Sequence, residues 1–417
     1  MKLSVAVLGC GNRGKAYTNI IASQTDRFTV TAIADTDGEQ LKLMHKMFGL
    51  PVAEDFTDIE AFLEKKRGDV LIIATPDRTH VPLAIRAMNL GYDVLLEKPI
   101  SDSREEVRQL LQTQQKTGKK AMVCHVLRYA PAYRKCDELL RSGKIGKLYA
   151  IDASERVGYW HWAQAYVRGI AGTLGEAHPT ILAKCCHDLD LIQHYAGSQC
   201  QTVSSVGGLS YFVKENAPEG AADRCVDCAH MNACPYSAKR IYVDMWHDWG
   251  EPDYRFPFFR AANVNPITEE ALYAGIRTNP FGRCVFRCGA TNADHQFVQM
   301  TFENGVKASM KMVYAAKAGR RIVFYGTLGE LTLDEREDSV TLSPYGGEVE
   351  QYSIRAMRTG AAGHGGGDQG LVDDLYAMLT GTKEQITSLA ESVESHLIGI
   401  AAEESRKDGG RLVAVHQ

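Results

Sequence analysis

Apolar and polar residues follow two different patterns along the chain. In the first 120 residues, 3–8 is a continuous apolar run and 28–34 is rich in β-branched residues, with a helical spacing at 15–23 between them. Continuous apolar runs are typical of parallel strands covered on both faces. Further elements are expected as a helix at 39–48, a strand at 70–74, a helix at 80–90 and a strand at 93–96. This alternation predicts an α/β domain with a doubly wound parallel sheet.

After about residue 122, longer strands joined by turns replace this pattern. Strands are expected at 147–154, 296–302, 307–314 and 321–325. Glu303-Asn304-Gly305 has the sequence of a hairpin turn, and helical segments are expected at 371–379 and 389–405. This half predicts an α+β domain with a large open mixed or antiparallel sheet. Residues 214–290 carry five cysteines and are expected to form a long loop, which usually has a function or is held in place.

Length and composition narrow the class of protein. The 417 residues exceed one typical core, so we expect two domains, 1–122 and 123–417. A formal net charge of -4 with no basic block argues against a nucleic-acid partner. No apolar run reaches the roughly 18 residues that span a membrane. The apolar start enters a glycine loop without a cleavage signature, so we expect a cytoplasmic protein.

A glycine loop follows the first predicted strand. Gly9, Gly11 and Gly14 form the pattern G-x-G-x-x-G at the start of a helix. The first glycine permits a tight turn, the second lets the backbone approach a pyrophosphate, and the third lets the helix pack on the strand. The helix N-terminus at Asn12 and Arg13 would bind the phosphates. The pattern predicts a dinucleotide site in the first domain, and the alternative is a chance glycine turn.

An acidic residue ends the second predicted strand and bears on the choice of cofactor. Asp35 is placed to accept hydrogen bonds from both ribose hydroxyls. Its carboxylate would repel a 2′-phosphate, so the sequence favours NAD over NADP. Arg13 would partly reverse this preference, so NADP stays an alternative.

Several motifs resemble the glucose–fructose oxidoreductase / inositol dehydrogenase (Gfo/Idh/MocA) family. They are the glycine loop, Ala74-Thr75-Pro76-Asp77 with His80, Glu97-Lys98-Pro99, Arg128-Tyr129 and Cys186-His187-Asp188-Leu189-Asp190. Together they cover the first 200 residues closely. The Cys-rich loop, Asp294-His295-Gln296 and the segment 363–368 are similar to a sugar-acting subgroup.

The resemblance implies an N-terminal Rossmann domain and a C-terminal domain for substrate binding and oligomerisation, whose open sheet forms a homodimer or homotetramer. It implies reversible oxidation of a secondary alcohol on a sugar, cyclitol or polyol. The cofactor-binding residues expected from motif and resemblance are Gly9, Gly11, Asn12, Arg13, Gly14, Asp35, Thr75, Pro76, His80, Glu97 and Lys98.

The resemblance also implies two catalytic residues. Lys98 would hydrogen-bond the substrate oxygen and stabilise developing alkoxide charge. His187 would take the hydroxyl proton, because an imidazole titrates near neutrality. The family pattern has Asp four residues before this histidine, whereas this chain has Ala183. Lys184 or Asp188 is therefore expected to substitute, and Lys98 itself is an alternative base.

Substrate-facing residues are expected around 160–169, where aromatic faces and donors suit a polyol or a carboxylated sugar. An ordinary surface loop is the alternative. The glycine-rich segment 363–367, with His364, is expected to be a lid, a close approach to the ligand or a flexible connection. The substrate candidates are Lys98, Arg128, His161, Arg168, Lys184, His187 and Asp188.

The cysteine spacing indicates a metal site. Cys225-x-x-Cys228 is followed by Cys234, and Cys284 comes at the far end of the same segment. Three or four thiolates can close a tetrahedral site, for which structural zinc is the usual occupant. An iron–sulfur cluster, free thiols or a disulfide are the alternatives.

These features predict an NAD(P)-dependent dehydrogenase that moves a hydride between nicotinamide and a secondary hydroxyl of a sugar, cyclitol or derivative. The hydride chemistry belongs to the cofactor, and the protein supplies position and electrostatics. Some relatives oxidise a sugar transiently and eliminate a substituent, so an NAD-dependent glycosidase or lyase is an alternative. A non-catalytic NAD-binding protein is a third, against which Lys98 and His187 argue.

Overall fold

The computed structural model of the protein describes residues 1–50, 53–253, 255–358, 363–382 and 387–416. Its first sheet has six strands in the order β3-β2-β1-β4-β5-β6, and every pair is parallel. The strands are β1 (Leu3–Leu8), β2 (Phe28–Ala34), β3 (Glu54–Phe56), β4 (Val70–Ile73), β5 (Asp93–Leu96) and β6 (Ala121–Val123). The doubly wound sheet expected from the apolar runs is confirmed. The two three-residue strands, β3 and β6, were not expected.

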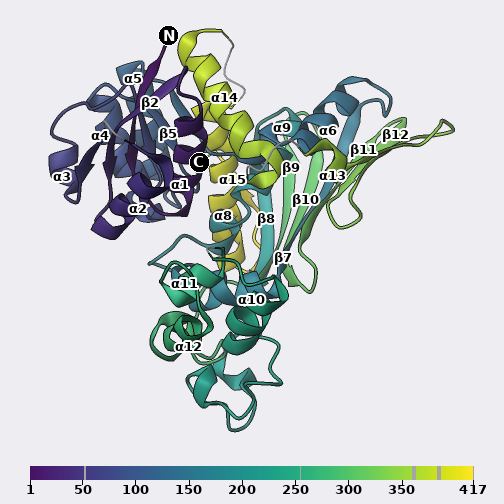
Figure 1. Cartoon of the computed structure of the whole chain (residues 1–417). Helices are drawn as coiled ribbons and strands as arrows, with labels where there is room; N and C mark the ends of the chain where they lie inside the picture. The colour runs from purple at the N-terminus through teal and green to yellow at the C-terminus, as the bar shows by residue number, and fades with distance from the viewer. Residues whose placement is uncertain (51–52, 254, 359–362, 383–386, 417) are drawn as a thin grey trace.

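Helices on both sides of this sheet carry the chain between strands (Figure 1). They include α1 (Asn12–Ser23), α2 (Gly38–Phe48), α3 (Ile59–Phe62), α4 (His80–Asn89) and α5 (Arg104–Thr117). The sequence pattern did not indicate α5, because it buries only Val107 and Leu110. Ser103 caps its start by accepting a hydrogen bond from the Glu106 amide.

The second sheet has nine strands in the order β14-β13-β12-β11-β7-β10-β9-β8-β15. The strands are β7 (Leu148–Gly158), β8 (Cys200–Gly208), β9 (His295–Phe302), β10 (Lys307–Ala315), β11 (Gly319–Gly326), β12 (Gly329–Asp334), β13 (Ser339–Pro344), β14 (Glu350–Ser353) and β15 (Val413–Ala414). Only β7 and β10 pair in parallel, so the sheet is mixed. The expected hairpin turn joins β9 to β10, with Gly305 at φ 92°.

Helices cover one face of this sheet and leave the other open (Figure 1). The covering helices include α6 (Pro131–Arg141), α9 (Cys186–Ala196) and α15 (Leu389–Lys407). Alternate residues of β9 are buried, as expected for a half-covered strand. Between them, Phe297 is 41% exposed and pairs in register with Val206 of β8, which is 53% exposed. The open face therefore carries apolar side chains.

Residues 214–290, called here the insert, lie below both sheets and are coloured teal to green in Figure 1. The expectation of a long loop was wrong for much of this segment. It contains the π-helix η7 (Lys239–Asp244) and the α-helices α10 (Met245–Asp248), α11 (Phe258–Ala262) and α12 (Glu269–Thr278). The Thr268 side chain caps α12, and Leu272 and Ile276, four residues apart, are its buried residues. These local signals were present in the sequence.

The C-terminal part of the chain returns to the first sheet. Helix α14 (Gly367–Thr380) packs beside α1, and Leu371, Val372 and Leu375 belong to the same apolar cluster as β1. His364, just before α14, thereby lies near Thr75 and Lys98, which follow β4 and β5. No helix in the described part of the chain is long and apolar enough to cross a membrane.

Candidate active site

The glycine loop has the geometry that its pattern predicts. Gly9 has φ 94°, and a Cβ there would lie 2.5 Å from the Ala74 carbonyl oxygen. A Cβ at Gly14 would lie 1.9 Å from the Gly9 carbonyl oxygen. Around a Cβ at Gly11 nothing lies within 4 Å, which leaves space for a ligand against the backbone. Gly9 and Gly14 are therefore required because a side chain would clash with the backbone there. Gly11 leaves room for a ligand to approach the backbone.

Asp35 ends β2 beside this loop. Its Oδ2 accepts a hydrogen bond from the Cys10 amide at 2.7 Å, and its Oδ1 accepts from the Asp37 amide at 2.9 Å. Gly11, Asn12 and Asp35 line one pocket, called here the adenosine pocket. A carboxylate held at the strand end has the position that a ribose diol requires.

The insert forms the other wall of the adenosine pocket. The contributing residues are Phe259, Arg260, Asn263, Val264, Asn265 and Phe281. These residues, called here the roof, are brought over the glycine loop from about 250 residues away in sequence. Sequence reasoning missed them, because no motif marks a segment that packs on a distant cofactor site.

Arg13 does not face the adenosine pocket. Its Nε lies 2.6 Å from Glu97, and its Nη2 lies 2.8 Å from Asp368 of α14. Although burial acts in the other direction, hydrogen bonds from His364 and Arg13 hold the pKa of Asp368 well below its usual range. Arg13 therefore connects the glycine loop to the segment after β5 and to α14. Its positive charge is balanced by Glu97 and Asp368.

A second pocket, the reaction pocket, collects most of the other predicted site residues. The expected residues that line it are Arg13, Thr75, His80, Glu97, Lys98, His161, Lys184 and His187. Asp77, Cys124, Tyr166, Arg320 and His364 complete the wall among other residues. His364, from the glycine-rich segment, thus approaches the pocket. Sequence reasoning missed Arg320, whose strand β11 carries no motif.

Two loops at the carboxyl ends of β4 and β5 hold Lys98. The His80 ring joins them, with Nδ1 at 2.7 Å from the Pro99 carbonyl oxygen and Nε2 at 2.9 Å from that of Thr75. Pro76 begins the short turn that follows Thr75. Lys98 Nζ donates to the carbonyl oxygen of Ala183 at 3.2 Å. The lysine is therefore aimed across the pocket at the segment before His187.

His187 lies in the first turn of α9 and is buried. Burial and four neighbouring cationic or ionisable groups, Lys98, His125, His364 and Arg320, hold its pKa well below the usual histidine range. The rings of His125 and His364 lie 6.0 Å and 6.1 Å from it, centroid to centroid. His187 is therefore a neutral imidazole near neutral pH, which can accept a proton.

The residues around the absent family aspartate form a charged cluster. Lys184 Nζ lies 3.3 Å from Glu155, and Arg320 lies 2.7 Å from Glu155 and 2.9 Å from Asp188. Burial raises the pKa of Asp188, and Glu155 raises it further. Asp188 is bound to Arg320 and is not among the pocket-lining residues, whereas Lys184 is. Of the two expected substitutes, the structure brings Lys184 to the pocket.

The structure places two expected substrate residues elsewhere. Arg128 is buried and forms a bidentate pair with Asp190 of α9 at 2.7 Å and 2.8 Å. Arg168 is buried against the cysteine-lined part of the insert. Arg128 and Arg168 are therefore buried in the interior, away from the reaction pocket. Asp188 does not line that pocket either.

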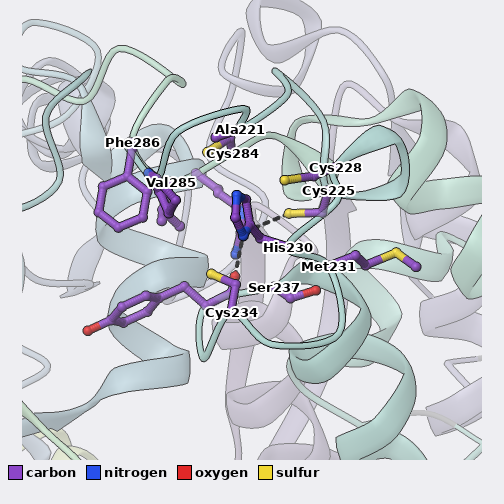
Figure 2. Close-up of a pocket in the computed structure, with 13 residues that line it drawn as sticks. Ala221, Cys225, Cys228, His230, Met231, Cys234, Ser237, Cys284, Val285 and Phe286 are labelled. Atoms are coloured by element: carbon purple, nitrogen blue, oxygen red, sulfur yellow. Dashed lines mark hydrogen bonds between the residues drawn. The ribbon is translucent and has the colours of Figure 1, made fainter. Parts of the chain in front are cut away.

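The four expected metal ligands, Cys225, Cys228, Cys234 and Cys284, line a third cavity, shown in Figure 2. All are free thiols. Within the described ranges, no group of three or more His, Cys, Asp or Glu residues is arranged to hold a metal ion. Zinc at these cysteines stays a prediction.

A parallel six-stranded sheet with this glycine loop is typical of a dinucleotide-binding domain. The family model "Oxidoreductase family, NAD-binding Rossmann fold" matches residues 3–125. The first domain therefore belongs to this family, Gfo/Idh/MocA.

Three known proteins are similar to this chain. The putative oxidoreductase YteT of Bacillus subtilis is 24% identical over 89% of this chain and 88% of its own length. An inositol 2-dehydrogenase of Rubrobacter xylanophilus is 28% identical over 35% of this chain, and the match spans 41% of that relative's length. The structure of levoglucosan dehydrogenase with NADH and levoglucosan has a TM-score of 0.70 and 17% identity, with 100% of both chains covered.

Proposed function

We propose that this chain is an NAD-dependent dehydrogenase that oxidises a secondary hydroxyl of a sugar, cyclitol or related polyol. One observation carries the proposal: Lys98 and a neutral His187 line the same pocket, next to the glycine-loop residue Arg13. The names of the similar proteins, an inositol 2-dehydrogenase and a levoglucosan dehydrogenase, point to the same substrate class.

The fit of the chain to a dinucleotide rests on two pockets that share the glycine loop. Asn12 and Asp35 line the adenosine pocket, and Arg13 lines the reaction pocket. Gly9, Gly11 and Gly14 shape the turn between them, while Thr75, Pro76, His80 and Glu97 position the loops beside the reacting end. Asp35 and the engagement of Arg13 by carboxylates both favour NAD over NADP.

The reaction needs one proton acceptor and one donor to the substrate oxygen. A bound NAD, held by the glycine loop and Asp35, would supply the acceptor for the hydride of the carbinol carbon. Lys98 holds the substrate oxygen and stabilises the negative charge that develops on it. His187 accepts the hydroxyl proton, because burial and the neighbouring Lys98 lower its pKa and keep its imidazole neutral. Lys98 and His187 therefore have different tasks, and His187 is the base.

The remaining polar wall suits the other hydroxyls of a polyol. Burial and Lys184 lower the pKa of His161 to about 3, so its ring is a neutral donor or acceptor. Lys184 and Arg320, although each is paired with Glu155, also line the pocket. Convergent donors and acceptors of this kind orient a polar ligand.

A panel of polyols and glycosides tests this function. We expect NADH to form with at least one free polyol or sugar, with the product oxidised at one carbon. Cleavage of a glycoside without net NADH would instead indicate the alternative, oxidation followed by elimination, which uses the same residues. Binding of NAD without turnover on any member of a broad panel would support a non-catalytic role.

We propose that the protein forms a homodimer or homotetramer through the open face of the nine-stranded sheet. Val206 and Phe297 are exposed on this face although they are apolar. Exposed apolar residues on an uncovered sheet are typical of an interface.

A further inference from the structure

The third cavity has an unusual wall for the interior of a protein. Cys225, Cys228, Cys234 and Cys284 line it together with Arg168, His230 and apolar or neutral residues. Figure 2 shows the sulfur atoms of Cys225 and Cys228 directed toward the centre of the cavity. No carboxylate is among the described residues that line it. The four thiols and the His230 ring are therefore the groups of this wall that commonly bind metal ions.

The backbone brings the four cysteines together from both ends of the insert. Arg224 and Arg283 form an isolated antiparallel bridge, so the two segments that carry Cys225 and Cys284 run next to each other. The two cysteines lie on opposite sides of the bridge, and both line the cavity. The Cys228 amide donates to the Cys225 carbonyl at 3.2 Å, which closes a turn between these two cysteines. The Cys234 amide donates to the His230 carbonyl at 2.9 Å in a second turn.

Arg168 places a buried positive charge at this cavity. The residue is 1% exposed. Its Nε donates to the Arg283 carbonyl at 2.6 Å, and its Nη2 donates to the Tyr236 carbonyl at 2.6 Å and to Cys225 Sγ at 3.4 Å. Nη1 has no hydrogen-bond partner, and no carboxylate of the described chain pairs with this guanidinium.

A buried guanidinium without a counter-charge destabilises a fold. Neutral carbonyl oxygens satisfy its hydrogen bonds but do not balance its charge. The Cys225 sulfur, which Arg168 already contacts, is part of the cavity wall. A bound centre with a net negative charge at these sulfurs would balance the guanidinium.

We propose that Cys225, Cys228, Cys234 and Cys284 bind one zinc ion as thiolates, with Arg168 donating to the thiolate cage. The spacing Cys-x-x-Cys followed by distant cysteines is that of structural zinc sites. Four thiolates around Zn²⁺ carry a net charge of 2−, which Arg168 partly neutralises. The four thiol protons leave to solvent, and no oxidation state changes. Because the described thiols do not form a ready cage, the ion draws them together as it binds.

His230 lines the same cavity but is assigned no place among the ligands. Its Nε2 already contacts the Glu219 carbonyl at 2.7 Å. A zinc ion with four thiolates has a net charge of 2−, which balances Arg168 better than a centre with three thiolates and an imidazole. The assignment is thus four sulfurs.

The site holds the two ends of the insert, and between them lies the roof of the adenosine pocket. Loss of zinc should therefore weaken NAD binding more than it slows chemistry at Lys98 and His187. This effect on NAD rests on the proposed function, whereas the metal site does not. Zinc content is measured without substrate, so the two proposals can fail separately.

The first experiment measures metals in the full-length protein, purified without chelators from cells grown with zinc. We expect about one zinc per chain by mass spectrometry. Cys225→Ser, Cys228→Ser, Cys234→Ser and Cys284→Ser should each lose it. Cys288→Ser is the matched control, because Cys288 follows in the same segment, does not line the cavity and contacts the Val167 carbonyl. Cys288→Ser and His230→Ala should both keep the metal.

A second measurement uses the unmodified protein, in case the serine variants fail to fold. A mercurial thiol reagent should release zinc to a chromophoric chelator as the cavity thiols react. Protein reconstituted with Co²⁺ should show thiolate-to-cobalt charge transfer and tetrahedral d–d bands. Arg168→Met should lose zinc to a chelator about tenfold faster than the unmodified protein, as expected for a residue that hydrogen-bonds a metal ligand. Arg168→Lys should lose zinc at an intermediate rate.

Three results would overturn the proposal. They are protein without stoichiometric zinc, iron and sulfide with the absorption of a cluster, or a disulfide among these cysteines by mass spectrometry. Loss of zinc from His230→Ala would overturn the four-thiolate assignment. Full zinc in a protein that turns over no substrate would support this site and contradict the proposed function.

Discussion

At the residue scale, Lys98 and His187 carry the proposed chemistry. Lys98→Ala removes the donor to the substrate oxygen, so kcat should fall about 10²- to 10³-fold. His187→Asn removes the base, and losses of about 10²- to 10⁴-fold are typical of such groups. NAD affinity, measured by titration calorimetry, should stay within about twofold in both variants. Near-normal turnover of either variant would show that its role is wrong.

The depressed pKa of His187 predicts the acid side of the pH profile. The neutral imidazole is the active form, so kcat/KM for oxidation should fall only below pH about 6.5, the ordinary histidine value. After burial, Lys98 is the largest cause of the depression. Lys98→Met should therefore raise the pKa of His187, which NMR titration of the ring can follow. An unchanged His187 titration in this variant would contradict the proposed electrostatic coupling.

Arg128 supplies a test of stability, not of substrate binding. Arg128→Met leaves Asp190 charged and unpaired in the interior, because both side chains are about 1% exposed. Chemical denaturation should show a loss of about 3–5 kcal/mol in the free energy of unfolding. Arg141→Met of α6 is the control, since Arg141 is 77% exposed, and it should cost below about 1 kcal/mol. If Arg128→Met raised the KM for the substrate and left the free energy of unfolding unchanged, Arg128 would instead be a substrate-binding residue.

At the element scale, the roof should determine how tightly NAD binds. Val264 is 47% exposed and lines the adenosine pocket. Val264→Asp adds a negative charge to the wall of a pocket proposed to hold an anionic dinucleotide, so the Kd for NAD should rise about fivefold to tenfold, about 1 kcal/mol, with kcat unchanged. Val349→Asp is the matched control, because Val349 is an exposed valine of the second sheet's edge. Equal effects of the two substitutions would show that the roof is not a cofactor contact.

Elements with strong local patterns were predictable, and elements defined by distant contacts were not. The runs that became β1 and β2 and the turn before β10 were found because their signals are local. The three-residue strand β3 and the amphipathic helix α5 carry few buried residues, so their patterns are weak. The motif residues of the reaction pocket were found by resemblance to a family. Arg320 and the roof residues line their pockets because of tertiary packing, and the sequence around them contains no motif that indicates it.

At the scale of the whole molecule, the open sheet predicts an oligomer. Phe297→Asp puts a charge into the exposed apolar patch, beside Val206. Light scattering after size exclusion should give a dimer or tetramer for the unmodified chain and a smaller species for the variant. Gln299→Asp, on the same strand, is a milder control because glutamine is already polar. A monomer in the unmodified protein at micromolar concentration would contradict the proposed assembly.

The separation of the two pockets also has a consequence for the order of events in turnover. The insert covers the adenosine pocket, whereas the reaction pocket has its own walls. A sugar can therefore exchange while the roof stays closed, but the dinucleotide has to pass it. We expect a compulsory sequence in which NAD enters first and NADH departs last. NADH should then inhibit competitively against NAD, and the oxidised sugar should not.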